Sequence, residues 1–378
     1  MISFIRSLWN KISLNDCGLF DVEVEKQRIF LESLTNPQDD IQRSYNQYCS
    51  QQFFVGRWKK ILLNIMAFPL ILMYYLKSYK KPNRRPCIEA VAILDGKDSN
   101  IIPLILRNKF SSWHHVFNSD EGVYFSKEDK EFFRLICREY PFSWLFLLKC
   151  LIKIGIYSNI VSTYNPKAIV VCNEYSFTSS VLTLYCEQNN IEHIDVMHGE
   201  KMFYIRDSFF RYHNCFVWNE KYISLFKQLK AYEGQFIVAL PESMKFSMLD
   251  VKPSIDYTYY LGDEGKKEIE QVVHYLTGLS NSGCKVAIRP HPRYTNSDDV
   301  KSIGSSIEIE DCQKVDIRES ILRTKNVVSL YSTVLSQAYQ NGVAIVIDDL
   351  SRPEMYKKLK DLQYIGLQFK HKLLSQII

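Results

Sequence analysis

The chain has 378 residues, of which 46% are hydrophobic and 24% charged, and its formal net charge is +5. This composition is typical of a globular protein and excludes a disordered one, and the length predicts two domains of ordinary size. The small net charge gives no reason to expect nucleic acid as a partner. Ten cysteines occur without a CxxC pair, which argues against a zinc site or a disulfide framework and for reduced thiols in the cytoplasm.

Residues 1–87 are predicted to form a helical N-terminal segment, and the start of the chain does not resemble a secretory signal. This segment contains an apolar run, ILLNIMAFPLILMYYL, at residues 61–76. The run is shorter than the roughly 20 residues that span a bilayer as a helix, and Pro69 interrupts it. Basic residues lie on both sides of it: Arg57, Lys59, Lys60, Lys77, Lys80, Lys81, Arg84 and Arg85. This pattern favours contact with an anionic membrane surface, while a buried core helix and a true span stay open as alternatives.

From residue 88 onwards, short apolar runs alternate with helical stretches. Strands are expected within residues 89–96, 167–174, 192–200 and 214–220, and, after a linker at 240–254, in IDYTYYL, KVAIRPHP, NVVSLYST and VAIVIDD. Helices are expected at 127–140, 176–190, 266–280 and at the C-terminus, in SRPEMYKKLKDL and KHKLLSQII. The alternation predicts an α/β protein with two doubly wound, parallel, Rossmann-like domains, residues 88–245 and 246–378. Ligands of such sheets bind beyond the carboxyl ends of the strands, which predicts a cleft between the two domains.

The string RPHPRYTN follows one of the predicted strands of the second domain. Pro290 and Pro292 restrict the backbone on both sides of His291, so the loop should hold the imidazole in a fixed place. Arg289 and Arg293 flank the loop, and an arginine fork matches a phosphate or a carboxylate. The string therefore predicts an anion site, and the alternative is a plain turn with a surface histidine.

Ser332 and Thr333 stand where the strand NVVSLYST gives way to a helix. Free backbone N–H groups, the helix dipole and the two hydroxyls would favour an anion there. The alternative is an ordinary helix cap, which uses the same residue types.

Carboxylates and another histidine follow other predicted strands. Asp263 lies in the string GDEG and Glu174 ends the string AIVVCNE. Each is a candidate acid, base or nucleophile, or else the cap of the helix that follows. His198, Gly199 and Glu200 form the end of the string VMHGE, where the glycine would permit close approach of a ligand to the backbone. The set combines basic groups suited to a nucleotide phosphate with a pair of carboxylates suited to sugar chemistry.

The strings RPHP and, some forty residues later, YSTVLSQA resemble the paired motifs of bacterial GT-B glycosyltransferases that use CMP-activated sugars. These enzymes include bacterial sialyltransferases and the Kdo transferases of capsule and O-antigen synthesis. CNEYSFTSS and IDVMHGE also resemble the N-terminal domain of capsule-type Kdo transferases. The resemblance covers roughly residues 88–350 and leaves the N-terminal segment unmatched.

The resemblance implies roles for the residues that match its motifs. His291 would contact the CMP phosphate, and Ser332 and Thr333 would bind phosphate or the donor carboxylate. In retaining Kdo transferases the nucleophile would correspond to Asp263 and the acid/base to Glu174. Inverting sialyltransferases carry a catalytic aspartate in the first domain, whereas the only similar string here, GDEG, follows the linker. This departure favours the Kdo type and leaves the stereochemistry open.

The sequence thus predicts an enzyme on the inner face of the bacterial cytoplasmic membrane that transfers Kdo or a related ulosonic acid from a CMP donor to a lipid-linked polysaccharide of the capsule or O-antigen. The resemblance implies neither a metal nor another cofactor. Three alternatives stay open: a polyol-phosphate transferase using CDP-glycerol or CDP-ribitol, a glycosyltransferase of another donor class, and a non-catalytic assembly protein at the membrane. A nucleic-acid partner is not expected, because the basic cluster at 77–85 lies beside an apolar run and not among interleaved aromatic residues.

Overall fold

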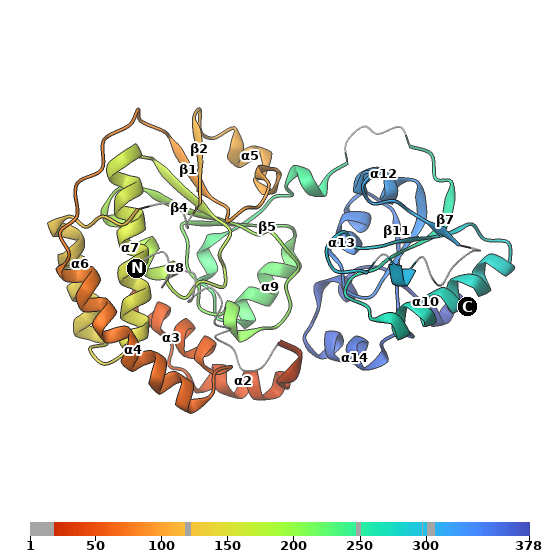
Figure 1. Ribbon diagram of the computed structural model, residues 1–378, viewed down its shortest axis with the longest axis horizontal. Coiled ribbons are helices and arrows are strands. Elements are labelled where there is room, and N and C mark those ends of the chain that lie inside the picture. The colour runs from red at the N-terminus through yellow and green to blue at the C-terminus, as the bar shows by residue number, and fades with distance from the viewer. Residues whose placement is uncertain (1–18, 118–121, 247–250, 297, 301–306) are drawn as a thin grey trace. The chain divides into compact units, whose positions relative to one another are not determined.

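Two parallel six-stranded sheets organise the chain in the computed structural model, which describes residues 19–117, 122–246, 251–296, 298–300 and 307–378. The chain divides into two units. The first comprises 1–198 and 204–239, and the second comprises 199–203 and 240–378. Figure 1 shows both units with many of their elements labelled.

The first unit is built on the sheet β2-β1-β3-β4-β5-β6, in which every neighbouring pair is parallel. Its strands are β1 (Ala90–Ile93), β2 (Trp113–Val116), β3 (Ala168–Val171), β4 (Glu192–Val196), β5 (Asn214–Val217) and β6 (Phe236–Val238). β1 and β3 are buried at every position, as expected for central strands covered by helices on both faces.

The helices of the first unit include an N-terminal group that precedes the sheet. They are α2 (Val24–Ser33), α3 (Asp40–Gln52), α4 (Arg57–Leu76), α5 (Leu104–Arg107), α6 (Lys127–Glu139), α7 (Trp144–Tyr164), α8 (Ser179–Gln188) and α9 (Glu220–Gln228). α6 begins with a capping box, in which Ser126 and Asp129 each accept a hydrogen bond from the other's backbone N–H. α4 lies alongside α7, and α3 contacts α8. The N-terminal helices are therefore part of the first unit.

The second unit is built on the sheet β12-β11-β10-β7-β8-β9, again with parallel pairs throughout. Its strands are β7 (Ile255–Tyr260), β8 (Val286–Arg289), β9 (Glu308–Ile309), β10 (Thr324–Ser329), β11 (Ala344–Ile347) and β12 (Lys372–Leu373). Its helices are α10 (Lys266–Asn281), α12 (Ile317–Leu322), α13 (Thr333–Gln340) and α14 (Pro353–Asp361).

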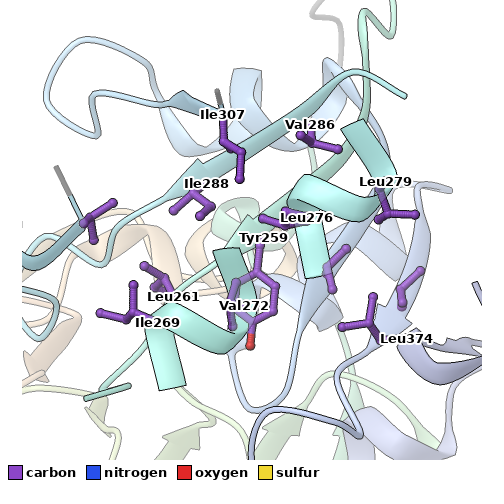
Figure 2. Close-up of a cluster of buried hydrophobic side chains, with 13 residues drawn as sticks. Tyr259, Leu261, Ile269, Val272, Leu276, Leu279, Val286, Ile288, Ile307 and Leu374 are labelled. Atoms are coloured by element: carbon purple, nitrogen blue, oxygen red, sulfur yellow. The ribbon is translucent and has the colours of Figure 1, made fainter. Parts of the chain in front are cut away.

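The core of the second unit forms where α10 covers one face of this sheet. Figure 2 shows apolar side chains of α10 facing those of β7 and β8: Ile269, Val272, Leu276 and Leu279 against Tyr259, Val286 and Ile288. The α10 residues recur at helical spacing, so they line one stripe of the helix. Burying each large aliphatic side chain contributes about 1.5–3 kcal/mol, which fixes α10 and the two strands that carry the loops described below.

The prediction of two Rossmann-like parallel sheets with helices and a helical N-terminal segment is confirmed. The expected helix at KHKLLSQII is wrong. There β12 pairs with β11 and is followed by a short 3₁₀ turn at Leu374–Gln376, because the apolar residues complete the sheet edge and its core and do not form a helix stripe.

Candidate functional site

The strand order of the second unit has one switch point, between β7 and β10. From β7 the chain proceeds to β8 and β9 on one side, and it returns to β10, β11 and β12 on the other. In open α/β sheets, ligands bind at such a point, outside the carboxyl ends of the strands. The loop that contains His291 follows β8, and Ser332 follows β10, so both predicted anion-binding elements flank β7.

The His291 ring is held by its own loop. Its Nδ1 atom accepts hydrogen bonds from the backbone N–H groups of Arg293 (3.1 Å) and Tyr294 (3.3 Å). Burial lowers the pKa of His291, and the charge of Arg293 lowers it further. The ring is therefore neutral near pH 7 with its proton on Nε2, because Nδ1 is used as an acceptor. The loop presents a single N–H donor in a fixed direction.

Thr295 joins the loop after β8 to the loop after β7. Its hydroxyl accepts from the backbone N–H of His291 (2.9 Å) and donates to the carbonyl of Gly262 (2.9 Å). A Cβ placed on Gly262 would lie 3.9 Å from the carbonyl oxygen of Tyr331, which follows β10. The loop after β7 therefore lies next to both the loop after β8 and the loop after β10.

The start of α13 has the geometry of a capped helix. The Ser332 hydroxyl accepts from the backbone N–H of Val334 (3.3 Å), and the Tyr364 hydroxyl donates to the Ser332 carbonyl (3.2 Å). The capping role anticipated as the alternative is therefore present. It leaves the hydroxyl proton of Ser332 able to donate, and Thr333 is the first residue of the helix. One turn further on, the hydroxyl of Ser336 donates to the carboxylate of Glu200.

Two adjacent carboxylates follow β7 and differ in their surroundings. The Asp263 side chain is 76% exposed, and its carboxylate accepts from Arg352 Nη1 at 2.8 Å. The Glu264 side chain is buried and accepts from the backbone N–H of Gly262, and burial raises the pKa of this carboxyl group. Asp263 is the one of the two that a substrate in solution can reach. Arg352, which orients it, follows β11 and directly precedes α14.

The two arginines beside His291 have different environments. Arg289 is buried, and its guanidinium forms an ion pair with Glu310 and donates to the Val315 carbonyl (2.9 Å). Arg293 is exposed. These contacts give Arg289 a structural function, and its assignment to nucleotide binding stays a prediction.

The first unit has its own switch point, between β1 and β3, and Glu174 follows β3. The Glu174 side chain is fully buried, and its Oε2 lies 3.8 Å from His198 Nδ1. Gln47 of α3 donates to the Glu174 carbonyl at 2.9 Å, so an N-terminal helix fixes the backbone here. A cation on His198 would be stabilised by the carboxylate at this distance.

The structure places the residues of the string VMHGE in different units. His198 belongs to the first unit with Glu174, while Gly199 and Glu200 belong to the second. A Cβ on Gly199 would meet no protein atom within 4 Å, so the space beside it is open. Of the two predicted catalytic carboxylates, Glu174 belongs to the first unit and Asp263 to the second.

The sequence reasoning missed Thr295 and Arg352, and it gave Glu264 no function. Both missed residues follow strands of the second sheet, Thr295 within RPHPRYT after β8 and Arg352 within DDLSRP after β11. The position at a strand's carboxyl end, which selected His291 and Ser332, would have selected them too. Among the residues that the structure describes, no group of three or more His, Cys, Asp and Glu side chains is placed to hold a metal ion.

Comparison with known proteins places this chain in no family. No family model matches the chain, and no curated protein matches it. Among solved structures it is similar to UDP-GlcNAc 2-epimerase from Neisseria meningitidis bound to UDP-GlcNAc, with 11% identity, a TM-score of 0.42, and 71% of this chain and 85% of that one covered. The glycotransferase of kitacinnamycin has 9% identity, a TM-score of 0.43, and coverage of 78% and 87%.

The wall teichoic acid polymerase TagF, in a structure with CDPG, is similar to the same degree. It shares 11% identity with a TM-score of 0.42, over 84% of this chain and 85% of that one. At these identities and TM-scores the likenesses support no statement about the family, substrate or reaction of this chain. The chemistry of this chain therefore has to be argued from its own residues.

Proposed function

We propose that this protein is a glycosyltransferase that transfers Kdo or a related ulosonic acid from a CMP-activated donor to a lipid-linked surface polysaccharide. The observation that carries the proposal is the pairing, across β7, of the His291 loop and the start of α13. A neutral imidazole N–H on one side and helix N–H groups with a hydroxyl on the other form a set of donors for a phosphate. The donor class rests on the resemblance of RPHP and YSTVLSQA to enzymes that use CMP-sugars.

In this proposal the second unit holds the nucleotide. His291 Nε2 donates to a phosphate oxygen of CMP, and Ser332 and Thr333 bind the same phosphate or the donor's carboxylate. Arg293, exposed at the loop, adds a positive charge. Glu200, fixed by Ser336 near the same helix, would contact the sugar and not the phosphate, because two anions repel each other.

Asp263 is proposed as the nucleophile and Glu174 as the acid/base. A carboxylate oxygen of Asp263 would attack the anomeric carbon of the ulosonic acid, and CMP would leave with the bonding electron pair on its phosphate oxygen. The acceptor hydroxyl would then attack the same carbon, giving its proton to Glu174 and releasing Asp263. The support for Asp263 is its exposed carboxylate at the end of β7, oriented by Arg352.

The direct test is release of CMP when the purified full chain is mixed with CMP-Kdo and a lipid-linked acceptor, with CDP-glycerol as the competing donor. We expect CMP release, and we expect CMP to raise the unfolding free energy by about 2.7 kcal/mol at a hundredfold excess over its Kd. No turnover with any CMP-ulosonic acid would refute the proposal. Turnover of CDP-glycerol would instead support the polyol-phosphate alternative, and absence of nucleotide binding would support a non-catalytic assembly protein.

Matched variants test the residue roles. His291→Ala should weaken CMP binding roughly tenfold to a hundredfold, the value of a hydrogen bond to a charged group, whereas His274→Ala on the exposed side of α10 should not change it. Asp263→Ala should abolish transfer while CMP still binds, with the exposed Asp361→Ala as control. Full transfer activity of the Asp263 variant would remove that residue from the mechanism.

A further inference from the structure

α4 carries many of its apolar residues on the side that faces away from the protein. Two of the described helices, α4 and α7, are long and apolar enough to cross a membrane on length and composition alone. α7 is a core helix, 67% buried over its most apolar window, whereas only 11% of the corresponding window of α4 is buried. Figure 1 shows α4 alongside α7. The buried side of α4 is therefore already occupied by protein.

The exposed apolar side chains of α4 form what we call the outer face: Trp58, Ile61, Leu62, Ile65, Met66, Phe68, Leu72, Met73 and Leu76. Trp58 is 81% exposed and Leu76 72% exposed, so the face extends from the first turn to the last. A surface helix of a globular protein normally carries charged and polar residues on this side. An exposed apolar face of this length marks a contact with a partner or a membrane.

A neighbouring turn extends the outer face. Asn64 donates to the Phe142 carbonyl (2.9 Å) and accepts from the Leu145 backbone N–H (3.0 Å), which ties α4 to the turn before α7. Phe142 is 79% exposed. Trp is enriched at the membrane–water interface, and Trp and Phe are both typical of apolar faces that lie in this interface.

The basic residues beside α4 indicate which partner the outer face contacts. Residues 57–88 contain eight Lys and Arg side chains and no Asp or Glu. Five of them follow α4 directly and are all exposed: Lys77, Lys80, Lys81, Arg84 and Arg85. A basic cluster immediately beside an apolar helix face is complementary to anionic lipid headgroups. A second protein chain would need acidic residues to match, whereas a bilayer supplies both the charge and the apolar layer.

We propose that the outer face of α4 docks on an anionic lipid bilayer, with the helix lying in the plane of the interface. The in-plane orientation follows from the structure, because the inner face of α4 packs on α7, and basic residues lie both in the first turn of α4 and beyond its C-terminal end, where the headgroups of one leaflet can bind them all. The inference does not depend on the proposed transfer reaction. It gives this chain a way to reach lipid-linked molecules at a membrane surface.

The test measures binding of the purified full chain to vesicles of phosphatidylcholine with and without phosphatidylglycerol, by flotation. We expect binding to the anionic vesicles, weakened by salt. Ile65→Ser with Leu72→Ser should lower the binding constant at least tenfold. Leu104→Ser with Ile105→Ser is the matched control, since these α5 residues are also exposed and apolar, and it should bind like the wild type.

A second variant tests the charge. Replacing Lys80, Lys81 and Arg84 with Gln should weaken binding to anionic vesicles roughly a hundredfold, about fivefold for each cation. The same replacement of Lys357, Lys358 and Lys360, exposed on α14, should leave it unchanged. Three outcomes would overturn the proposal: no binding to anionic vesicles, dimers in solution that Ile65→Ser with Leu72→Ser dissociates, or resistance of the membrane-bound protein to alkaline extraction, which indicates a span.

Discussion

Arg289→Met distinguishes the two roles proposed for this arginine, a structural ion pair with Glu310 and binding of the nucleotide. Arg289 Nη1 forms a buried ion pair with Glu310, and Nη2 donates to the Val315 carbonyl at 2.9 Å. Glu310 keeps a second partner, because Arg323 Nη2 lies 2.6 Å from its other carboxylate oxygen. The variant therefore removes one of two cations from a carboxylate whose side chain has no exposed surface.

The magnitude follows from these contacts. Removing one partner of a buried ion pair costs about 3–5 kcal/mol. The remaining Arg323 offsets part of this cost, and the Met side chain fills part of the Arg289 volume, while the lost hydrogen bond to Val315 adds about 1 kcal/mol. We expect a net loss of about 3 kcal/mol. The unfolding temperature should fall by roughly 6–12 °C, taking 2–4 °C per kcal/mol for a unit of this size.

The assay combines thermal and urea unfolding with calorimetric titration of CMP. Arg293→Met, a change at the exposed neighbour, should leave the unfolding temperature unchanged. The double variant Arg289→Met/Glu310→Met should be closer to wild type than Arg289→Met alone, since an apolar pair often replaces a buried ion pair at little cost. An unaltered unfolding temperature with a tenfold loss of CMP affinity would refute the structural role and assign Arg289 to the nucleotide site.

Three further predictions concern other sites. Burial lowers the pKa of His193 well below its ordinary value, so the unfolded state takes up the proton first as the pH falls. The free energy of unfolding should therefore decrease below about pH 6.5, by at most about 1.4 kcal/mol per pH unit. Urea unfolding at pH 7.5 and 5.5 should show this loss, and an unchanged free energy of unfolding would contradict it. Gly155→Ala in α7 would place a Cβ 2.6 Å from Cζ of Phe125 and should lower the free energy of unfolding by about 1–3 kcal/mol. Gly278→Ala, where a Cβ meets nothing within 4 Å, should raise it by up to about 1 kcal/mol in the same measurement. Ser332→Ala should lose about 1 kcal/mol of capping energy, while Ser332→Asp keeps the cap and should repel the phosphate of CMP. Undiminished CMP binding by Ser332→Asp would exclude the start of α13 as the phosphate site.

The sequence predicted the central strands well, because β1 and β3 are buried on both faces and read as continuous apolar runs. It did not reveal α7, since this helix is buried on most of its sides and shows no apolar stripe. The edge strands β9 and β12 have two residues each, too few for any pattern to be recognised.

The candidate site was predictable where it depends on position along a strand and unpredictable where it depends on partners far along the chain. His291 and Ser332 follow β8 and β10, and this was evident from the apolar runs before them. The burial of Arg289 was not, because its partner Glu310 stands 21 residues further on in another segment. The Arg352 contact with Asp263 joins residues 89 positions apart, a separation that local patterns do not encode.

The short segment 199–203 affects whether the two units can be prepared as separate fragments. Because it belongs to the second unit although it follows β4 of the first, the polypeptide passes from one unit to the other three times, at 198/199, 203/204 and 239/240. Within the second unit this segment supplies Glu200 to Ser336 and the Phe203 backbone N–H to the Leu362 carbonyl. A fragment that starts at residue 240 would lack both contacts, so neither half is a self-contained piece that a single cut could release.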